Sequence, residues 1–151
     1  MITVVAVGKK HEDWVSNGIK RYQTRCKQPW SFEWQLIPHS KLDGQQARQE
    51  ESERILVRLH PQDFVILLDE HGQTFDSPAL SCQLNELFVQ GKNITIVIGG
   101  AFGVSTALIQ RANLVWSLSP LVLPHQLVRL ILAEQLYRAQ EIVRGSKYHH
   151  Q

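Results

Sequence analysis

The chain has 151 residues, a length typical of one α/β domain, so we expect a single domain over residues 1–151. Hydrophobic residues make up 43% and charged residues 20%, a composition that supports a packed core and excludes a disordered chain. Lys and Arg number 16 against 14 Asp and Glu, which leaves a formal net charge of only +2. This balance of charges excludes a protein that binds nucleic acid by charge alone. An RNA partner would have to be recognised by shape, or by a surface that a second subunit completes.

No stretch of the sequence has the run of apolar residues that a membrane span requires. Residues 1–7 are apolar, but Gly8 and two lysines follow them, which is the wrong order for an export signal. Cys26 and Cys82 lie far apart and fit neither a metal-binding nor a redox spacing. We therefore expect a cytoplasmic protein with no metal site and no membrane contact.

The first third of the chain alternates between strand-like and helix-like patterns. The apolar run 2–7 predicts a buried strand, and the spacing of apolar residues over 13–25 predicts a helix. The residues of this helix expected to face the core are Trp14, Ile19 and Tyr22. Alternation over 32–37 predicts a strand with one wet face, and the charged stretch 45–59 predicts a second helix.

The same alternation continues to the end of the chain. The remaining predicted strands are 64–68, 94–98 and 114–117. A helix is expected to begin with Ser77 as its N-cap and Pro78 in its first turn, and to stop at Gly91. A short helix is capped near Ser105, and the longest helix runs from about 126 to 144.

Strands and helices that alternate in this way predict an α/β fold, with a mostly parallel sheet covered by helices on both faces. Ligands of such sheets bind beyond the carboxyl ends of the strands. The loops that follow Leu68, Ile98 and Ser117 are therefore the expected places of a binding site.

Three glycines leave the strand 94–98 in the segment Ile98-Gly99-Gly100-Ala101-Phe102-Gly103. Because glycine has no Cβ, such a turn allows a ligand to approach the backbone closely. The spacing matches neither the dinucleotide fingerprint nor the P-loop. From spacing alone, a ligand-binding turn and a plain strand-to-helix turn are equally open.

A second segment of interest is Leu118-Ser119-Pro120-Leu121-Val122-Leu123-Pro124. Its two prolines favour an extended backbone, which can present free N–H and C=O groups beside apolar side chains. That combination suits an adenine ring on a ligand without phosphates. A structured connector is the alternative, and composition alone favours it.

The last helix and the tail form the third segment. Glu134 and Arg138 stand four residues apart and are expected to pair on the surface. Apolar residues cover much of this helix, which predicts burial on more than one side, including against a second subunit. The tail 145–151 is polar and aromatic, and its terminal position alone predicts a frayed end.

A set of short segments runs through nearly the full length of the chain. They are Val5-Ala6-Val7-Gly8-Lys9; Gly18, Tyr22 and Arg25; Leu68-Asp69-Glu70-His71-Gly72; residues 98–103; Trp116-Ser117-Leu118-Ser119; Leu123-Pro124-His125-Gln126-Leu127-Val128-Arg129; residues 133–139; and Tyr148-His149. In their order and spacing these segments resemble the RlmH family of small SPOUT-superfamily methyltransferases. Residues 93–149 carry the most specific part of the resemblance.

The resemblance implies an α/β fold with a C-terminal trefoil knot, and S-adenosyl-L-methionine bound in that knot. By position, the cofactor contacts of the family fall on Leu68, Gly99, Leu118, Ser119, Pro120, Leu121, Val122 and Leu123. These residues belong to the same strand-end loops that the sequence pattern selects.

The resemblance also implies a homodimer in which the C-terminal tail of the partner completes the active site. The implied substrate is 23S rRNA within the assembled 70S ribosome, methylated on N3 of the pseudouridine at position 1915. The candidate base is His149, with Tyr148 stacking on or orienting the nucleobase. Arg138 and Arg129 are candidates for holding a phosphate or the cofactor carboxylate, unless Arg138 only pairs with Glu134. His150 stands where the family commonly has a basic residue, which weakens a charge contact there.

Two other functions share these sequence features. One is a SPOUT-type tRNA methyltransferase, and the other is a non-catalytic ribosome-binding module that kept the fold. The intact glycine turn and the segment 118–123 favour an enzyme that binds the cofactor over the second alternative.

Overall fold

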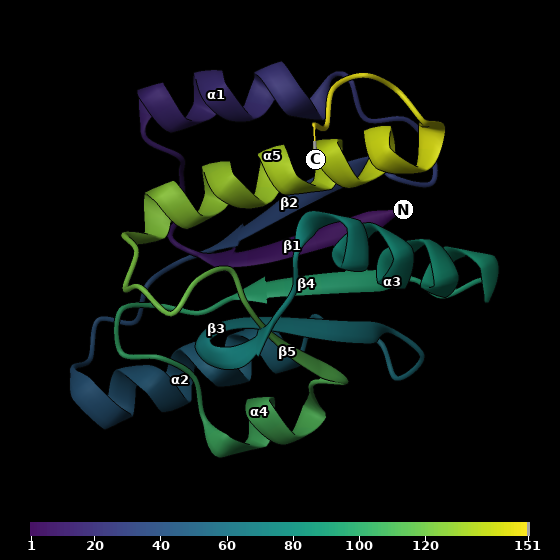
Figure 1. Cartoon of the computed structure of the whole chain (residues 1–151). Helices are drawn as coiled ribbons and strands as arrows, with labels where there is room; N and C mark the ends of the chain where they lie inside the picture. Colours follow the sequence, from purple (N-terminus) through teal and green to yellow (C-terminus); the bar gives the residue numbers. More distant parts are fainter. Residues whose placement is uncertain (151) are drawn as a thin grey trace.

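The computed structural model describes residues 1–150 (Figure 1). Five strands form one sheet: β1 (Ile2–Val7), β2 (Phe32–Ile37), β3 (Phe64–Thr74), β4 (Ile94–Ile98) and β5 (Leu114–Ser117). Their order across the sheet is β2-β1-β4-β3-β5, and every neighbouring pair is parallel. The carboxyl ends of all five strands therefore meet at one edge of the sheet.

Helices cover both faces of this sheet (Figure 1). On one face α5 (His125–Arg144) lies between α1 (Asp13–Gln23) and α3 (Ser77–Val89), and it packs against both. On the other face lie α2 (Gly44–Leu56) and α4 (Thr106–Arg111), which contact each other. The predicted α/β architecture, a parallel sheet with helices on both faces, is confirmed.

The strands alternate between two apolar layers, because successive side chains of a strand point to opposite faces. In β1, Val4 and Ala6 join the core under α1, α3 and α5, whereas Val5 and Val7 join the core above α2 and α4. Both faces of the central strands are therefore buried, which explains why these strands appear as continuous apolar runs in the sequence.

Three local expectations were wrong. Trp14 does not face the core: its side chain is 53% exposed and its indole N–H donates to Glu12, while Val15 takes the inward position. The N-cap of α3 is Asp76, whose carboxylate accepts from the backbone N–H of Ala79. β3 continues beyond Leu68 to Thr74, because an irregularity between Leu68 and Gln73 lets the strand pair with β5 a second time.

The connection from β5 to α5 crosses the carboxyl edge of the sheet. β5 lies at one edge of the sheet. In contrast, α5 lies over the middle of one face, between α1 and α3. Residues 118–124 must therefore pass the ends of β3 and β4. The resemblance implies a trefoil knot that involves this crossing. The knot stays a prediction.

Within residues 1–150, no helix combines the length and the apolar character needed to cross a membrane.

Candidate functional site

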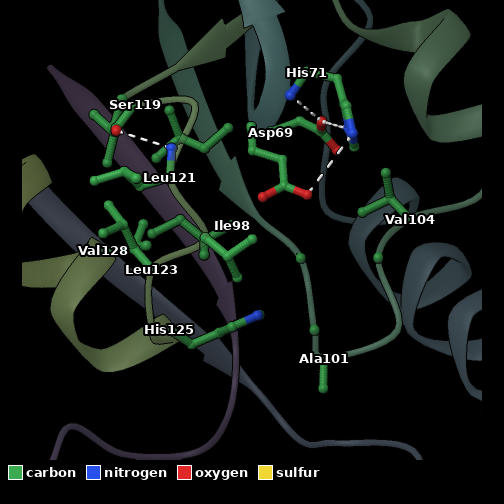
Figure 2. A pocket seen from close by; sticks show the side chains of 17 residues that line it. Asp69, His71, Ile98, Ala101, Val104, Ser119, Leu121, Leu123, His125 and Val128 are labelled. Atoms are coloured by element: carbon green, nitrogen blue, oxygen red, sulfur yellow. Dashed lines mark hydrogen bonds and ion pairs between the residues drawn. The ribbon is translucent and has the colours of Figure 1, made fainter.

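A cavity of about 350 Å³ opens at the carboxyl ends of β3, β4 and β5 (Figure 2). Its walls come from the irregular part of β3 at 68–71, from the loops 98–104 after β4 and 118–123 after β5, and from the start of α5. These are the three segments that the sequence pattern selects, although the first belongs to β3 and not to a loop. The volume lies within the range of small-molecule and cofactor sites.

The residues predicted to hold the cofactor are brought together by these loops. Those that line the cavity are Leu68, Gly99, Leu118, Ser119, Leu121, Val122 and Leu123. Pro120 is exposed and does not line the cavity. Contact of these residues with the cofactor itself stays a prediction.

In the wall after β4, there is no room for a side chain at Gly99 or Gly100. A Cβ on Gly99 would lie 2.6 Å from Cγ1 of Val104, which is shorter than any ordinary contact. A Cβ on Gly100 would collide with the carboxylate of Glu51. Gly103, with a φ of +80°, closes the turn by donating its N–H to the carbonyl of Gly100 at 3.1 Å.

The wall after β5 combines apolar side chains with free backbone groups. The hydroxyl of Ser119 accepts from the N–H of Leu121 at 3.0 Å and turns the chain (Figure 2). Among residues 1–150, the backbone N–H groups of Val122 and Leu123 have no hydrogen-bond partner. The side chains of Leu121 and Val122 are 70% and 82% exposed. This wall can therefore offer edge hydrogen bonds and apolar contact to a flat ring.

Charge in the cavity is negative rather than positive. Asp69 and Glu70 line it, with His71 held by a hydrogen bond from its Nδ1 to the Asp69 carboxylate at 3.0 Å (Figure 2). Among the described lining residues there is no Lys or Arg. Such donors favour phosphate ligands and carboxylates repel them, so this cavity is a poor fit for a nucleoside phosphate. It fits an adenosyl ligand that carries positive charge, such as a sulfonium.

His125, the first residue of α5, closes the inner side of the cavity. Burial is the main reason why its pKa lies below the ordinary value, and the positive charge of Arg129 one turn further on acts in the same direction. His125 is therefore neutral near pH 7 and adds no positive charge to the cavity.

The predicted catalytic residues lie elsewhere in the chain. His149 borders a second hollow formed with the start of α3, and its Nδ1 contacts Nη1 of Arg138 at 3.1 Å. Tyr148 donates its hydroxyl to Glu134 at 3.2 Å, and burial followed by that carboxylate raises the pKa of Tyr148 to about 12. The tail therefore packs on α5 instead of fraying. None of Arg138, Tyr148 and His149 lines the cavity at the strand ends, although Leu118 borders both hollows.

The expected ion pair between Glu134 and Arg138 is present, with 3.1 Å between Nε and Oε1. The same guanidinium lies over the ring of Tyr148, 4.8 Å from its centroid. Arg138 therefore does more than pair on the surface, because it also joins α5 to both aromatic residues of the tail.

Several residues of the site were not singled out from the sequence. His125 and Val128 line the cavity because α5 begins directly after the second proline of the segment 118–124. That position could have been read from the sequence. From the sequence, Asp69 and Glu70 could lie at the rim of a pocket or in a simple turn, and the structure places both of them and His71 in the lining of the cavity. Nothing in the sequence marks Glu51, which lies in a helix of charged residues.

The fold and the cavity define an α/β protein with a cavity at the carboxyl edge of a parallel sheet, whose lining suits a cationic adenosyl-type ligand. Residues 1–149 match the family described as "Predicted SPOUT methyltransferase". The chain belongs to the SPOUT methyltransferase family.

Two relatives are similar to the chain over nearly their whole length. A protein of Desulfitobacterium hafniense (strain DSM 10664 / DCB-2), "Ribosomal RNA large subunit methyltransferase H", is 41% identical, with 98% of each chain covered. A protein of Hahella chejuensis with the same name is 39% identical over 98% of this chain and 97% of its own. Among solved structures, a probable methylase family protein from Haemophilus influenzae Rd KW20 has a TM-score of 0.55 at 13% identity, covering 97% of this chain and 67% of that one. This last likeness concerns the fold.

The lowered pKa of His125 predicts a specific dependence of stability on pH. The unfolded chain takes up a proton at this residue below its ordinary pKa near 6.5, whereas the folded chain resists it, so acid favours unfolding. The contribution of His125 is complete above that pH and is lost as the pH falls toward the lowered pKa. The unfolding free energy of the wild type should therefore fall between about pH 7.5 and 5.5, and we expect this fall to be smaller in His125→Gln.

Urea unfolding of both proteins at each pH measures this difference. His150→Gln, the same change at an exposed tail residue, serves as the control and should leave the pH slope as in the wild type. An unchanged slope in His125→Gln would show that burial of this ring does not oppose its protonation.

Proposed function

We propose that the chain methylates large-subunit ribosomal RNA with S-adenosyl-L-methionine as the methyl donor. The observation that carries this proposal is the cavity at the strand ends, which has apolar walls, free backbone N–H groups and two carboxylates but no Lys or Arg in its lining. Membership of the SPOUT methyltransferase family and 41% identity to a large-subunit rRNA methyltransferase over 98% of the chain support the same activity.

The finer assignment concerns the acceptor. We propose N3 of the pseudouridine at position 1915 of 23S rRNA, reached in the assembled 70S ribosome and therefore in the cytoplasm. The small net charge of +2 supports a partner with a large defined shape, because such a partner does not have to be held by charge alone.

S-adenosylmethionine, when bound, supplies an electrophilic methyl group on a sulfonium. Leu121, Val122 and Leu123 provide apolar contact for the adenine ring, and the N–H groups of the last two are free to bond to its edge. The carboxylates of Asp69 and Glu70 lie where positive charge is favourable. The chain thus accelerates the transfer by positioning and by excluding water.

We propose that the enzyme is a homodimer with composite sites. Within one chain, the candidate base His149 borders a hollow different from the donor cavity, and Tyr148 does not line the donor cavity either. A groove between α1 and α5, with Leu127, Leu130 and Ile131 in its lining, leaves apolar surface partly uncovered. A second subunit on this face would bury the groove and bring its own tail to the cavity.

The state of His149 in one chain supports this arrangement. Because Arg138 can only donate, Nδ1 of His149 accepts the bond between them and the ring hydrogen resides on Nε2. His149 can accept a proton at Nδ1 only after it leaves Arg138. Docking of the tail at the site of a partner would release it for that role.

The donor cavity is tested by Gly99→Val. The new side chain would meet Val104 and push the glycine turn into the cavity, so we expect affinity for S-adenosylmethionine to fall about tenfold or more. Isothermal titration calorimetry measures the affinity. Gly91→Asn serves as the control, because this residue has open space around it and a φ of +74° that Asn tolerates. Unchanged affinity in Gly99→Val would place the donor elsewhere.

The base is tested by His149→Ala. We expect the single-turnover rate on ribosomes with saturating donor to fall about 100-fold or more while donor affinity stays as in the wild type. Co-expression of His149→Ala with Gly99→Val then tests the composite site. Heterodimers restore turnover only if the tail acts on the cavity of the partner subunit. A near-normal rate in His149→Ala would exclude this residue as the base.

The acceptor is tested in a strain that lacks the gene. Mass spectrometry of its 23S rRNA should reveal one missing methyl group at position 1915, which returns on complementation. Methylation assays of purified protein on 70S ribosomes and on bulk tRNA separate this function from that of a tRNA methyltransferase. Incorporation into tRNA alone would overturn the proposed substrate, and an unaltered rRNA in the deletion strain would do the same.

A further inference from the structure

One face of α2 holds the glycine turn of the donor cavity from behind. Arg48, Glu51 and Ser52 stand at positions i, i+3 and i+4 of the helix and therefore share one face. Arg48 donates from Nε to the carbonyl of Phe102 at 2.8 Å, and Ser52 accepts at Oγ from the backbone N–H of Ser105 at 2.8 Å. The turn from 99 to 105 is thus tied to α2 at its middle and at its carboxyl end.

Glu51 lies between these two contacts and is the unusual member of the face. Its side chain is buried, with 3% of the residue exposed. Oε2 accepts from the backbone N–H of Ser40 at 2.9 Å, but Oε1 has no hydrogen-bond partner among residues 1–150. Oε1 lies directly behind Gly100, because a Cβ added there would collide with it.

A buried carboxylate with an unpartnered oxygen is unfavourable for folding alone. An apolar side chain of similar size could fill this volume at a lower cost in folding free energy. The presence of a carboxylate at position 51 therefore calls for another reason. The neighbours of Glu51 supply such a reason, because its carboxylate contacts the segments that follow two different strands. Gly100 follows β4, and Ser40 follows β2, and both lie at the edge that carries the cavity.

None of Arg48, Glu51 and Ser52 lines the cavity. Gly99, Gly100, Ala101, Gly103 and Val104 do line it, and they belong to the turn that α2 holds. The hydrogen bonds and packing of these three side chains therefore act on the ligand through the shape of this turn.

We propose that Glu51 is a positioning residue, which with Arg48 and Ser52 holds the glycine turn in the conformation that binds the methyl donor. Glu51 fixes the distance between α2 and the backbone at Gly100, and its unpartnered oxygen is the acceptor available to that backbone. This inference rests on the proposed function for the identity of the ligand, but not for the contact between α2 and the turn.

Glu51→Gln is the main test, because it keeps the volume of the side chain while it removes the charge and one acceptor. We expect the dissociation constant of S-adenosylmethionine and the KM for this donor to rise about tenfold or more. We expect kcat and the KM for ribosomes to change little, since neither depends on this turn once the donor is bound. Glu53→Gln, the same change at an exposed position of the same helix, should behave as the wild type.

Hydrogen exchange gives a readout that does not depend on the ligand. In the absence of any donor, we expect the amides of 99–105 to exchange faster in Glu51→Gln, while those of β1 and α5 keep their protection. If Glu51→Gln fails to fold, Arg48→Met carries the same test. This residue is exposed, and its substitution removes only the bond to Phe102.

A double-mutant cycle tests the contact itself. Gly100→Ala adds the methyl group that collides with Glu51, and we expect it to weaken donor binding. Glu51→Ala makes room for that methyl group, so adding Gly100→Ala to Glu51→Ala should cost much less than adding it to the wild type. Additive losses would overturn the proposed contact.

The outcomes separate this inference from the proposed function. Unchanged donor affinity together with unchanged exchange in Glu51→Gln would overturn the positioning role. Faster exchange of the turn, in a protein whose wild type binds no S-adenosylmethionine, would support the positioning role and overturn the proposed cofactor.

Discussion

A buried guanidinium joins the end of the first strand to the last helix, and the shape of the site depends on this contact. Arg129 is 1% exposed and donates to the carbonyls of Val7 at 2.9 Å, Gly8 at 3.2 Å and Lys10 at 3.1 Å. A buried charge is tolerated when such acceptors surround it. The contact fixes the start of α5 over β1, and the connection that leaves β5 must therefore cross the strand ends to reach it. That crossing forms one wall of the cavity.

The elements were predictable because each follows from a local pattern. β1, β2, β4 and β5 have the predicted bounds, since short apolar runs mark β1, β4 and β5 and alternation of apolar and polar residues marks β2. The errors arose where long-range contacts decide. Trp14 is apolar and has helical spacing, but α5 covers the neighbouring face of α1 and leaves Trp14 outside. The extension of β3 depends on a second pairing with β5, which no local pattern of residues 69–74 reveals.

The functional site was also predictable only in part. The three segments follow from the rule that ligands of parallel sheets bind beyond the carboxyl ends of the strands, so this rule and the family resemblance select the same residues. The residues behind these loops are different. Glu51 belongs to a helix with two other glutamates, and only the path of the turn after β4 distinguishes it from them. The sequence could not reveal the tail contacts either, because Tyr148 and His149 are positioned by Glu134 and Arg138 across a reversal of the chain.

The two walls of the cavity are held by buried charges of opposite sign. Arg129 holds the start of α5 and thus the wall that follows β5, whereas Glu51 lies behind the wall that follows β4. His125 lies in the field of both, because Arg129 lowers its pKa and Glu51 raises it. The charges needed to fix the backbone are therefore placed behind the walls, and the lining itself keeps only the carboxylates of Asp69 and Glu70. A cationic ligand meets no positive side chain in such a cavity, which is the condition for binding a sulfonium without repelling it.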